Sequence, residues 1–167
     1  MAAVLERPRL INLAGFIICA VLIAAAFYME LALGMEPCPL CMFQRIGVYA
    51  LGAVFLIAAL HGARAWGARV YGVLLLLVAA LGGAVSVRHL YLQSLPAEEV
   101  PACGPGLDYL MDVFPLFEAI RVVFEGSGEC AEVHTILGLS IPAWTLMAFI
   151  GLGLAGFIYN WLVAERR

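Results

Sequence analysis

The sequence predicts an all-α membrane protein: a four-transmembrane-helix bundle with a short amphipathic helix in the second loop on its outer side. Two observations carry this prediction. Of the 167 residues, 65% are hydrophobic and 13% are charged, and the mean hydropathy is +1.02. Soluble domains carry about a quarter charged residues, so the composition is that of a membrane protein. Four apolar runs of spanning length would use about half of the chain, which leaves enough for loops and predicts a single membrane domain.

The four runs are expected to span the membrane at approximately residues 10–29, 42–60, 70–87 and 141–163. Each has the length of a helix that crosses the hydrocarbon layer, where the backbone must satisfy its own hydrogen bonds. The second run reaches spanning length because residues 42–45 are counted in its first turn.

The first run also resembles a signal peptide, because Arg7 and Arg9 precede it and small residues occupy positions 24–26. Its apolar stretch is longer than the roughly 7–15 residues of a signal-peptide core. We therefore expect a first helix that is retained rather than cleaved.

The arginines predict the orientation of the helices, because the chain contains no lysine. Cytoplasmic segments of membrane proteins carry an excess of positive charge. Six of the nine basic residues fall in three segments that share one side if four helices alternate: Arg7, Arg9, Arg64, Arg69, Arg166 and Arg167. Both termini are therefore predicted to be cytoplasmic, and the loops 30–41 and 88–140 to lie on the outer side.

The outer loop 88–140 contains a stretch with helical periodicity, in which apolar residues recur at helical spacing and acidic residues lie off the stripe. A short amphipathic helix in the membrane interface is one interpretation, and a turn of helix packed onto the bundle is another. The stripe consists of Leu107, Leu110, Met111, Phe114 and Phe117.

Four of the five cysteines fall in the two outer loops, and the fifth, Cys19, is most simply a packing residue within the first span. Thiols outside the cytoplasm can oxidise, so two disulfides are permitted there. Four cysteines allow three pairings; the spacing suggests Cys38 with Cys41 and Cys103 with Cys130, but the sequence does not decide between them. Structural zinc is an alternative, but no second close pair completes a site, so no metal is expected.

The position of the Cys38–Cys41 pair favours a redox role. A disulfide across so short a loop removes little unfolded-state entropy, whereas a neighbouring thiol can resolve a mixed disulfide. Cys41 precedes the second span, where the helix N-terminus favours a thiolate. Arg45 lies one turn deeper and could stabilise that thiolate and polarise an acceptor oxygen. His89 could hydrogen-bond a quinone carbonyl. The alternative for both is an interfacial side chain, with Arg45 reaching towards the headgroups.

Five motifs occur in a fixed order along nearly the whole chain. They are Cys38-Pro39-Leu40-Cys41-Met42-Phe43-Gln44-Arg45, Arg88-His89-Leu90-Tyr91-Leu92-Gln93, Cys103, Gly128-Glu129-Cys130-Ala131-Glu132 and Leu137-Gly138-Leu139-Ser140-Ile141-Pro142-Ala143-Trp144. This ordered set resembles the DsbB family, bacterial inner-membrane proteins that form disulfide bonds. One departure is Gln44, where some relatives carry an acid, and it leaves the preferred quinone open.

The resemblance implies a thiol:quinone oxidoreductase that reoxidises a DsbA-like periplasmic thioredoxin-fold oxidase. The reduced oxidase would attack Cys103 of a Cys103–Cys130 disulfide, and Cys130 would be reoxidised through Cys38. Cys41, helped by Arg45, would then pass the electrons to ubiquinone or menaquinone.

The same resemblance implies the surroundings of the protein. The outer loops would be periplasmic, and His89 matches a position near the family's quinone pocket. The expected partners are the DsbA-like oxidase, the lipid bilayer and the respiratory quinone pool, with no nucleic acid.

Two other classes of function are alternatives to this one. A static scaffold, with fixed disulfides or bound zinc, would have cysteines that never change state. A small transporter is disfavoured, because no acidic residue lies within any predicted span.

Overall fold

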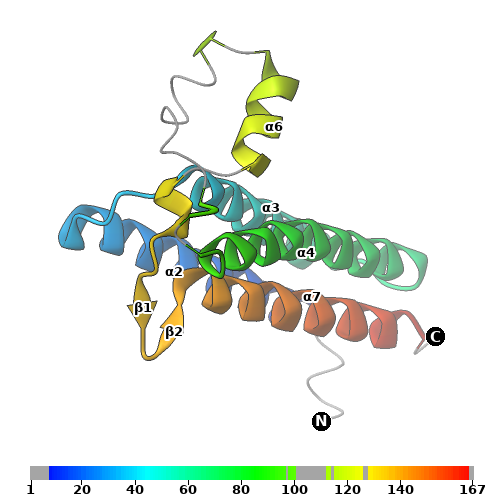
Figure 1. The fold of residues 1–167 in the computed structure, drawn as a ribbon. Helices are drawn as coiled ribbons and strands as arrows, with labels where there is room; N and C mark the ends of the chain where they lie inside the picture. Colours follow the sequence, from blue (N-terminus) through cyan, green and yellow to red (C-terminus); the bar gives the residue numbers. More distant parts are fainter. Residues whose placement is uncertain (1–7, 97, 101–111, 114, 126–127, 166–167) are drawn as a thin grey trace.

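The computed structural model describes residues 8–96, 98–100, 112–113, 115–125 and 128–165. Four long helices form a bundle (Figure 1): α2 (Pro8–Leu33), α3 (Pro39–His61), α4 (Trp66–Gln93) and α7 (Ile141–Glu165). Each is long and apolar enough to cross a membrane. The predicted all-α membrane protein with four transmembrane helices is therefore confirmed.

The connection between α2 and α3 and both ends of α3 carry residues whose backbone preferences suit those positions. Pro39 opens α3, where its missing N–H costs nothing, and Gly62 ends α3 in the left-handed conformation with φ of 60°. Gly34, with φ of 66°, follows the end of α2. The short connection between α2 and α3 reverses the chain, and the first turns of α3 lie alongside the last turns of α2 (Figure 1).

The helices are longer than the predicted spans, and this corrects the loop boundaries. α3 starts at Pro39 rather than at residue 42, and α4 continues to Gln93. Residues 88–93 are therefore helical, although they were expected to belong to the outer loop. Hydropathy detects only the apolar part of a helix, whereas the backbone continues until a residue interrupts it. As a consequence, Cys41 and His89 lie on helices and are held more rigidly than loop residues.

Between α4 and α7 the structure contains three smaller features. A 3₁₀ turn, η1 (Gly128–Ala131), is followed by an antiparallel pair of two-residue strands, β1 (Thr135–Ile136) and β2 (Leu139–Ser140). Leu137 and Gly138 join the strands with φ of 53° and 84°, as a tight hairpin turn requires. This hairpin was not predicted, because strands of two residues have no readable periodicity.

A short helix, α6 (Leu116–Glu125), also occurs in this part of the chain. Val123 of α6 is buried, whereas Phe117 is 88% exposed. The ring of Phe124 meets that of Phe43 edge to face and ties α6 to the start of α3. Of the predicted amphipathic stripe, only Phe117 belongs to this helix. The other four members lie outside the described residues: Leu107, Leu110, Met111 and Phe114.

Two buried asparagines join the first and last helices. Asn12 and Asn160 are each 2% exposed and donate to each other's side-chain oxygen at 3.2 and 3.1 Å. Asn160 also donates to the carbonyl oxygen of Gly156 at 2.8 Å. Each amide therefore supplies the hydrogen bonds that the other needs in an apolar surrounding.

Helices α4 and α7 share the most extensive contact, and small residues bring their backbones together. A Cβ atom added at Gly153 would overlap the Cβ of Ala79, which has no side chain that can rotate away. Gly153→Ala is therefore expected to lower the free energy of unfolding by about 1–3 kcal/mol, because the helices must separate. Reversible unfolding in mixed micelles measures this change.

Gly151→Ala provides the matched control for this prediction. A Cβ at Gly151 would meet nothing within 4 Å, so the same substitution on the same helix should have little effect. Equal losses in both variants would contradict close packing at Gly153.

Candidate active site

The N-terminus of α3 brings Cys38 and Cys41 together. Cys38 is the N-cap residue, with φ of −66° and ψ of 162°, and its sulfur accepts a hydrogen bond from the backbone N–H of Cys41 at 3.4 Å. Both side chains are free thiols, and their sulfur atoms lie 2.9 Å apart. The Cys-x-x-Cys motif therefore forms a compact dithiol, which can close to a disulfide with a small movement.

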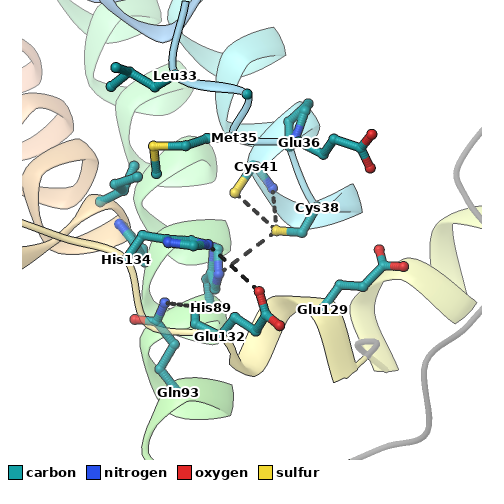
Figure 2. A pocket seen from close by; sticks show the side chains of 14 residues that line it. Leu33, Met35, Glu36, Cys38, Cys41, His89, Gln93, Glu129, Glu132 and His134 are labelled. Atoms are coloured by element: carbon teal, nitrogen blue, oxygen red, sulfur yellow. Dashed lines mark hydrogen bonds and ion pairs between the residues drawn. The ribbon is translucent and has the colours of Figure 1, made fainter. Parts of the chain in front are cut away.

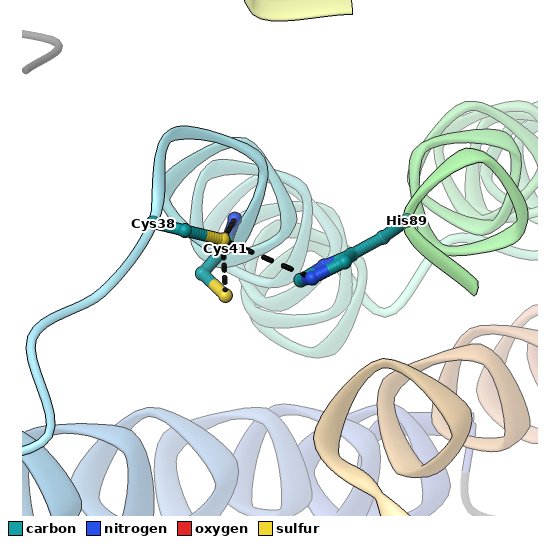
Figure 3. Close-up of side chains that lie close together, drawn as sticks. All are labelled: Cys38, Cys41 and His89. Carbon is teal, nitrogen blue, oxygen red and sulfur yellow. Dashed lines mark hydrogen bonds between the residues drawn. The ribbon is translucent and has the colours of Figure 1, made fainter. Parts of the chain in front are cut away.

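His89 reaches this dithiol from α4. Its Nε2 atom lies 3.8 Å from the sulfur of Cys38, and its ring is 2% exposed (Figure 3). The sequence suggested a position near a quinone carbonyl, and the structure puts the ring against Cys38. The ligating atoms of Cys38, Cys41 and His89 all lie within 4.8 Å of one another, as in a metal site. Two thiolates on one zinc ion stand about 3.8 Å apart, so the sulfurs would have to separate before zinc could bind.

Cys130 lies against the same dithiol. It is fully buried in η1 and packs in one cluster with Cys38 and with residues of α3, α4 and α6. It hydrogen-bonds with the thiol of Cys38, and its backbone hydrogen-bonds with His89. The structure thus unites three of the four predicted redox cysteines. The fourth, Cys103, lies outside the described residues.

The thiol of Cys38 is held in its protonated form. The hydrogen bond with Cys130 lowers the pKa of this thiol, but the hydrogen bond with Cys41 and burial together outweigh it and raise the pKa to about 12. Thiolate is the reactive form of cysteine, so Cys38 should be a poor nucleophile at neutral pH.

The raised pKa predicts slow alkylation of Cys38 in the reduced protein. At pH 8 iodoacetamide should modify Cys38 about 10³-fold more slowly than an ordinary cysteine, and the rate should rise about tenfold per pH unit. Mass spectrometry of the peptide that contains Cys38 measures this rate, and protein unfolded in detergent is the control. A rate that levels off near pH 9 would contradict the prediction.

Arg45 lies one turn after Cys41, as predicted, but is held by α2. Its guanidinium forms an ion pair with Glu30, donates to the carbonyl oxygen of Ala26 at 3.2 Å and lies over the ring of Phe27. With 15% of its side chain exposed, it is anchored rather than free in the interface. The sequence did not pair Glu30 with Arg45. One feature of the sequence could have indicated this pair: an acidic residue follows the first span, and a single arginine occurs at the start of the second.

A hydrogen-bonded chain of side chains, all buried except the half-buried Thr145, supports His89, and the sequence did not reveal it. Nε2 of Gln44 lies 3.0 Å from Nδ1 of His89, and the hydroxyl of Thr145 lies 2.7 Å from Oε1 of Gln44. Ser86 in turn lies 3.3 Å from the hydroxyl of Thr145. Among the described residues, every buried side-chain nitrogen or oxygen has a partner. The chain links α3, α4 and α7 directly beneath the thiols.

A cavity of about 550 Å³ opens beside this cluster (Figure 2). Its walls come from the connection between α2 and α3, the end of α4, the segment around η1 and the start of α7. Cys38, Cys41 and His89 line it, together with Glu129 and Glu132. Binding sites for small molecules have volumes of about 300–1,000 Å³, so the cavity could hold a small ring beside Cys41.

Comparisons with known proteins identify the family. The sequence model described as "Disulfide bond formation protein DsbB" matches residues 8–159. Curated relatives named disulfide bond formation protein B include one from Nitrosococcus oceani, 53% identical over 140 residues and 83% of each chain. Another, from Marinobacter nauticus, is 55% identical over 135 residues and 80% of each chain.

A third such relative, from Methylococcus capsulatus, is 48% identical over 163 residues, which cover 97% of this chain and 99% of the other. No solved structure matches the chain. The resemblance that the five motifs predicted is confirmed: this chain belongs to the DsbB family of membrane proteins that form disulfide bonds.

Proposed function

We propose that this protein is a thiol:quinone oxidoreductase that reoxidises a DsbA-like periplasmic thioredoxin-fold oxidase. The electrons taken from the oxidase pass to ubiquinone or menaquinone in the bacterial inner membrane. The observation that carries the proposal is a dithiol, with sulfurs 2.9 Å apart, at the N-terminus of a helix of spanning length, with Cys130 packed against it. Membership of the family supports disulfide formation, and the geometry of the site supports this route for the electrons.

The partner would react with a Cys103–Cys130 disulfide. A thiolate of the reduced oxidase attacks Cys103, which forms a mixed disulfide and releases the thiolate of Cys130. The second thiol of the oxidase then displaces Cys103, which leaves the partner oxidised and both loop cysteines reduced. Two electrons and two protons have then entered the protein.

Transfer to the membrane pair would follow through Cys38. The thiolate of Cys130 attacks Cys38 of a Cys38–Cys41 disulfide, and the thiolate of Cys41 leaves. Cys103 then displaces Cys38 from Cys130, which restores the loop disulfide and leaves Cys38 and Cys41 reduced. The contact between Cys130 and Cys38 supports this step, because exchange requires the attacking sulfur to reach its target.

The cavity beside Cys41 suits a quinone ring in size, and Cys41 and His89 would border it. A bound quinone would accept two electrons and two protons as Cys38 and Cys41 close their disulfide. Arg45 does not line the cavity. We assign it an electrostatic role, in which its guanidinium, fixed by Glu30, favours negative charge on Cys41 from one turn deeper in α3.

We further propose that the chain forms one membrane domain, with both termini in the cytoplasm and the cysteine-bearing loops in the periplasm. The turn between α3 and α4 and the end of α7 lie at the opposite end of the bundle from η1 and the hairpin (Figure 1). The arginine excess at that opposite end supports this orientation.

The test is an anaerobic assay of the purified protein in micelles. A reduced thioredoxin-fold oxidase is supplied with ubiquinone-1 in one arm and a soluble menaquinone analogue in the other. One quinone should be reduced for each disulfide formed in the partner, and the faster arm identifies the preferred acceptor. Omission of the partner is the control. Oxidation of the partner without consumption of either quinone would contradict the proposal.

A further inference from the structure

We propose that Gln44 is a positioning residue that fixes the protonation of His89. It holds the ring in the neutral form whose proton is on Nε2, and so aligns a series of hydrogen bonds that ends at the sulfur of Cys41. The proton on Nε2 would lower the cost of negative charge on Cys38 when this sulfur leaves a disulfide. The use of that charge in disulfide exchange rests on the proposed function; the arrangement of protons does not.

The first part of the argument concerns the two ring nitrogens. The side-chain nitrogen of Gln44 can only donate a hydrogen bond, and it lies 3.0 Å from Nδ1 of His89. Nδ1 must therefore accept, and the proton of a neutral ring must be on Nε2. The hydroxyl of Thr145, 2.7 Å from Oε1 of Gln44, donates to that oxygen and sets which way the amide faces.

The second part concerns what Nε2 meets. It lies 3.8 Å from the sulfur of Cys38, and the ring also hydrogen-bonds with the backbone of Cys130. Because Nδ1 already accepts from Gln44, a bond from the ring to a backbone carbonyl must use a proton on Nε2. The ring thus serves as a bridge between Gln44 and two cysteines.

The last donor in the series is the thiol of Cys38. Its sulfur accepts from the backbone N–H of Cys41 and donates to the sulfur of Cys41 at 2.9 Å. From Thr145 through Gln44, His89 and Cys38, every donor therefore points towards Cys41. The pKa of Cys38, raised to about 12, agrees with a proton that stays on this sulfur.

The opposite direction is less favourable. If the amide of Gln44 turned over, Thr145 would donate to the carbonyl oxygen of Pro142, which lies 3.0 Å away, and Nδ1 would carry the proton. Nε2 would then have to accept from the thiol of Cys38, a weak donor 3.8 Å away. A poorly satisfied buried acceptor is costly, so the first direction is favoured.

Nitrogen NMR of the reduced protein in micelles tests the assignment directly. The chain has three histidines, and the signals of His89 are identified by their loss in His89→Asn. At pH 7 the chemical shifts should report a bare Nδ1 and a protonated Nε2. A protonated Nδ1 with a bare Nε2 would overturn the proposal.

Two variants test the role of the amide. Gln44→Leu should abolish the single-tautomer signature and raise the ratio of Cys41 to Cys38 alkylation at pH 7 by about tenfold, because the thiolate of Cys38 loses one charge-assisted hydrogen bond. Thr145→Val should change both readouts in the same direction, because it frees the amide to turn over.

Gln93→Leu is the matched control, since it makes the same chemical change on α4, one turn after His89. The amide of Gln93 donates to the carbonyl oxygen of Glu132 and takes no part in the series. Unchanged readouts in Gln44→Leu, or an equal change in Gln93→Leu, would overturn the proposal.

Neither readout needs quinone or a protein partner, so the two proposals fail separately. Normal turnover with the proton on Nδ1 would overturn the role of Gln44 alone. The expected tautomer without any quinone-dependent turnover would contradict the proposed function and leave the positioning of His89 intact.

Discussion

Cys41→Ser is expected to abolish quinone reduction, with a loss of turnover of at least about 10³-fold. A serine hydroxyl does not form a thiolate near neutral pH and cannot close a disulfide with Cys38. The protein would therefore have no way to give up the two electrons received from its partner. The decrease in quinone absorbance in the presence of reduced partner measures the effect.

Cys19→Ala is the matched control for this loss. Cys19 is buried in the core of the bundle, where it packs beside Phe55 and Leu51, away from the thiol pair. Its replacement removes a sulfur without touching the proposed route, so turnover should stay within about twofold of the wild type. Retained turnover in Cys41→Ser would rule out this cysteine as the electron donor.

Cys130→Ser is expected to separate the two halves of the reaction. Oxidation of the protein partner should fall by at least about 10³-fold, because no disulfide can form with Cys103. Quinone-dependent oxidation of dithiothreitol should continue, since this small dithiol can reach Cys38 and Cys41 through the cavity that they line. Parallel assays with the two reductants show the separation.

Cys41→Ser provides the comparison, because it should lose activity towards both reductants. Two outcomes would contradict the proposed route. One is oxidation of the protein partner by Cys130→Ser at the wild-type rate. The other is oxidation of dithiothreitol by Cys41→Ser.

The sequence predicted best those features that depend on neighbouring residues. Four spans could be identified because a membrane demands long apolar helices. Arg45 was predicted to lie one helical turn after Cys41 because the two residues are four positions apart, and both lie in α3. The helices extend past the predicted spans because hydropathy does not report where a helix ends, as α4 shows by continuing through His89 to Gln93.

Contacts between distant residues could not be predicted. Gln44 and Thr145 are 101 residues apart, and a single polar residue in an apolar helix does not indicate its partner. In the sequence, Glu30 is one of several acidic residues in the outer loops. Its pairing with Arg45 depends on the packing of α2 against α3. The pairing of these groups depends on helix rotation and packing, which emerge only when the whole bundle is assembled.

The paired amides of α2 and α7 bear on how this protein and its relatives can diverge. Asn12 and Asn160 exchange two hydrogen bonds, so a change at either one removes both bonds from the other, which stays buried. A change of both to apolar residues of similar shape avoids that cost. Positions 12 and 160, which are 148 residues apart, should therefore covary. An alignment of many relatives would show that the two residues change together.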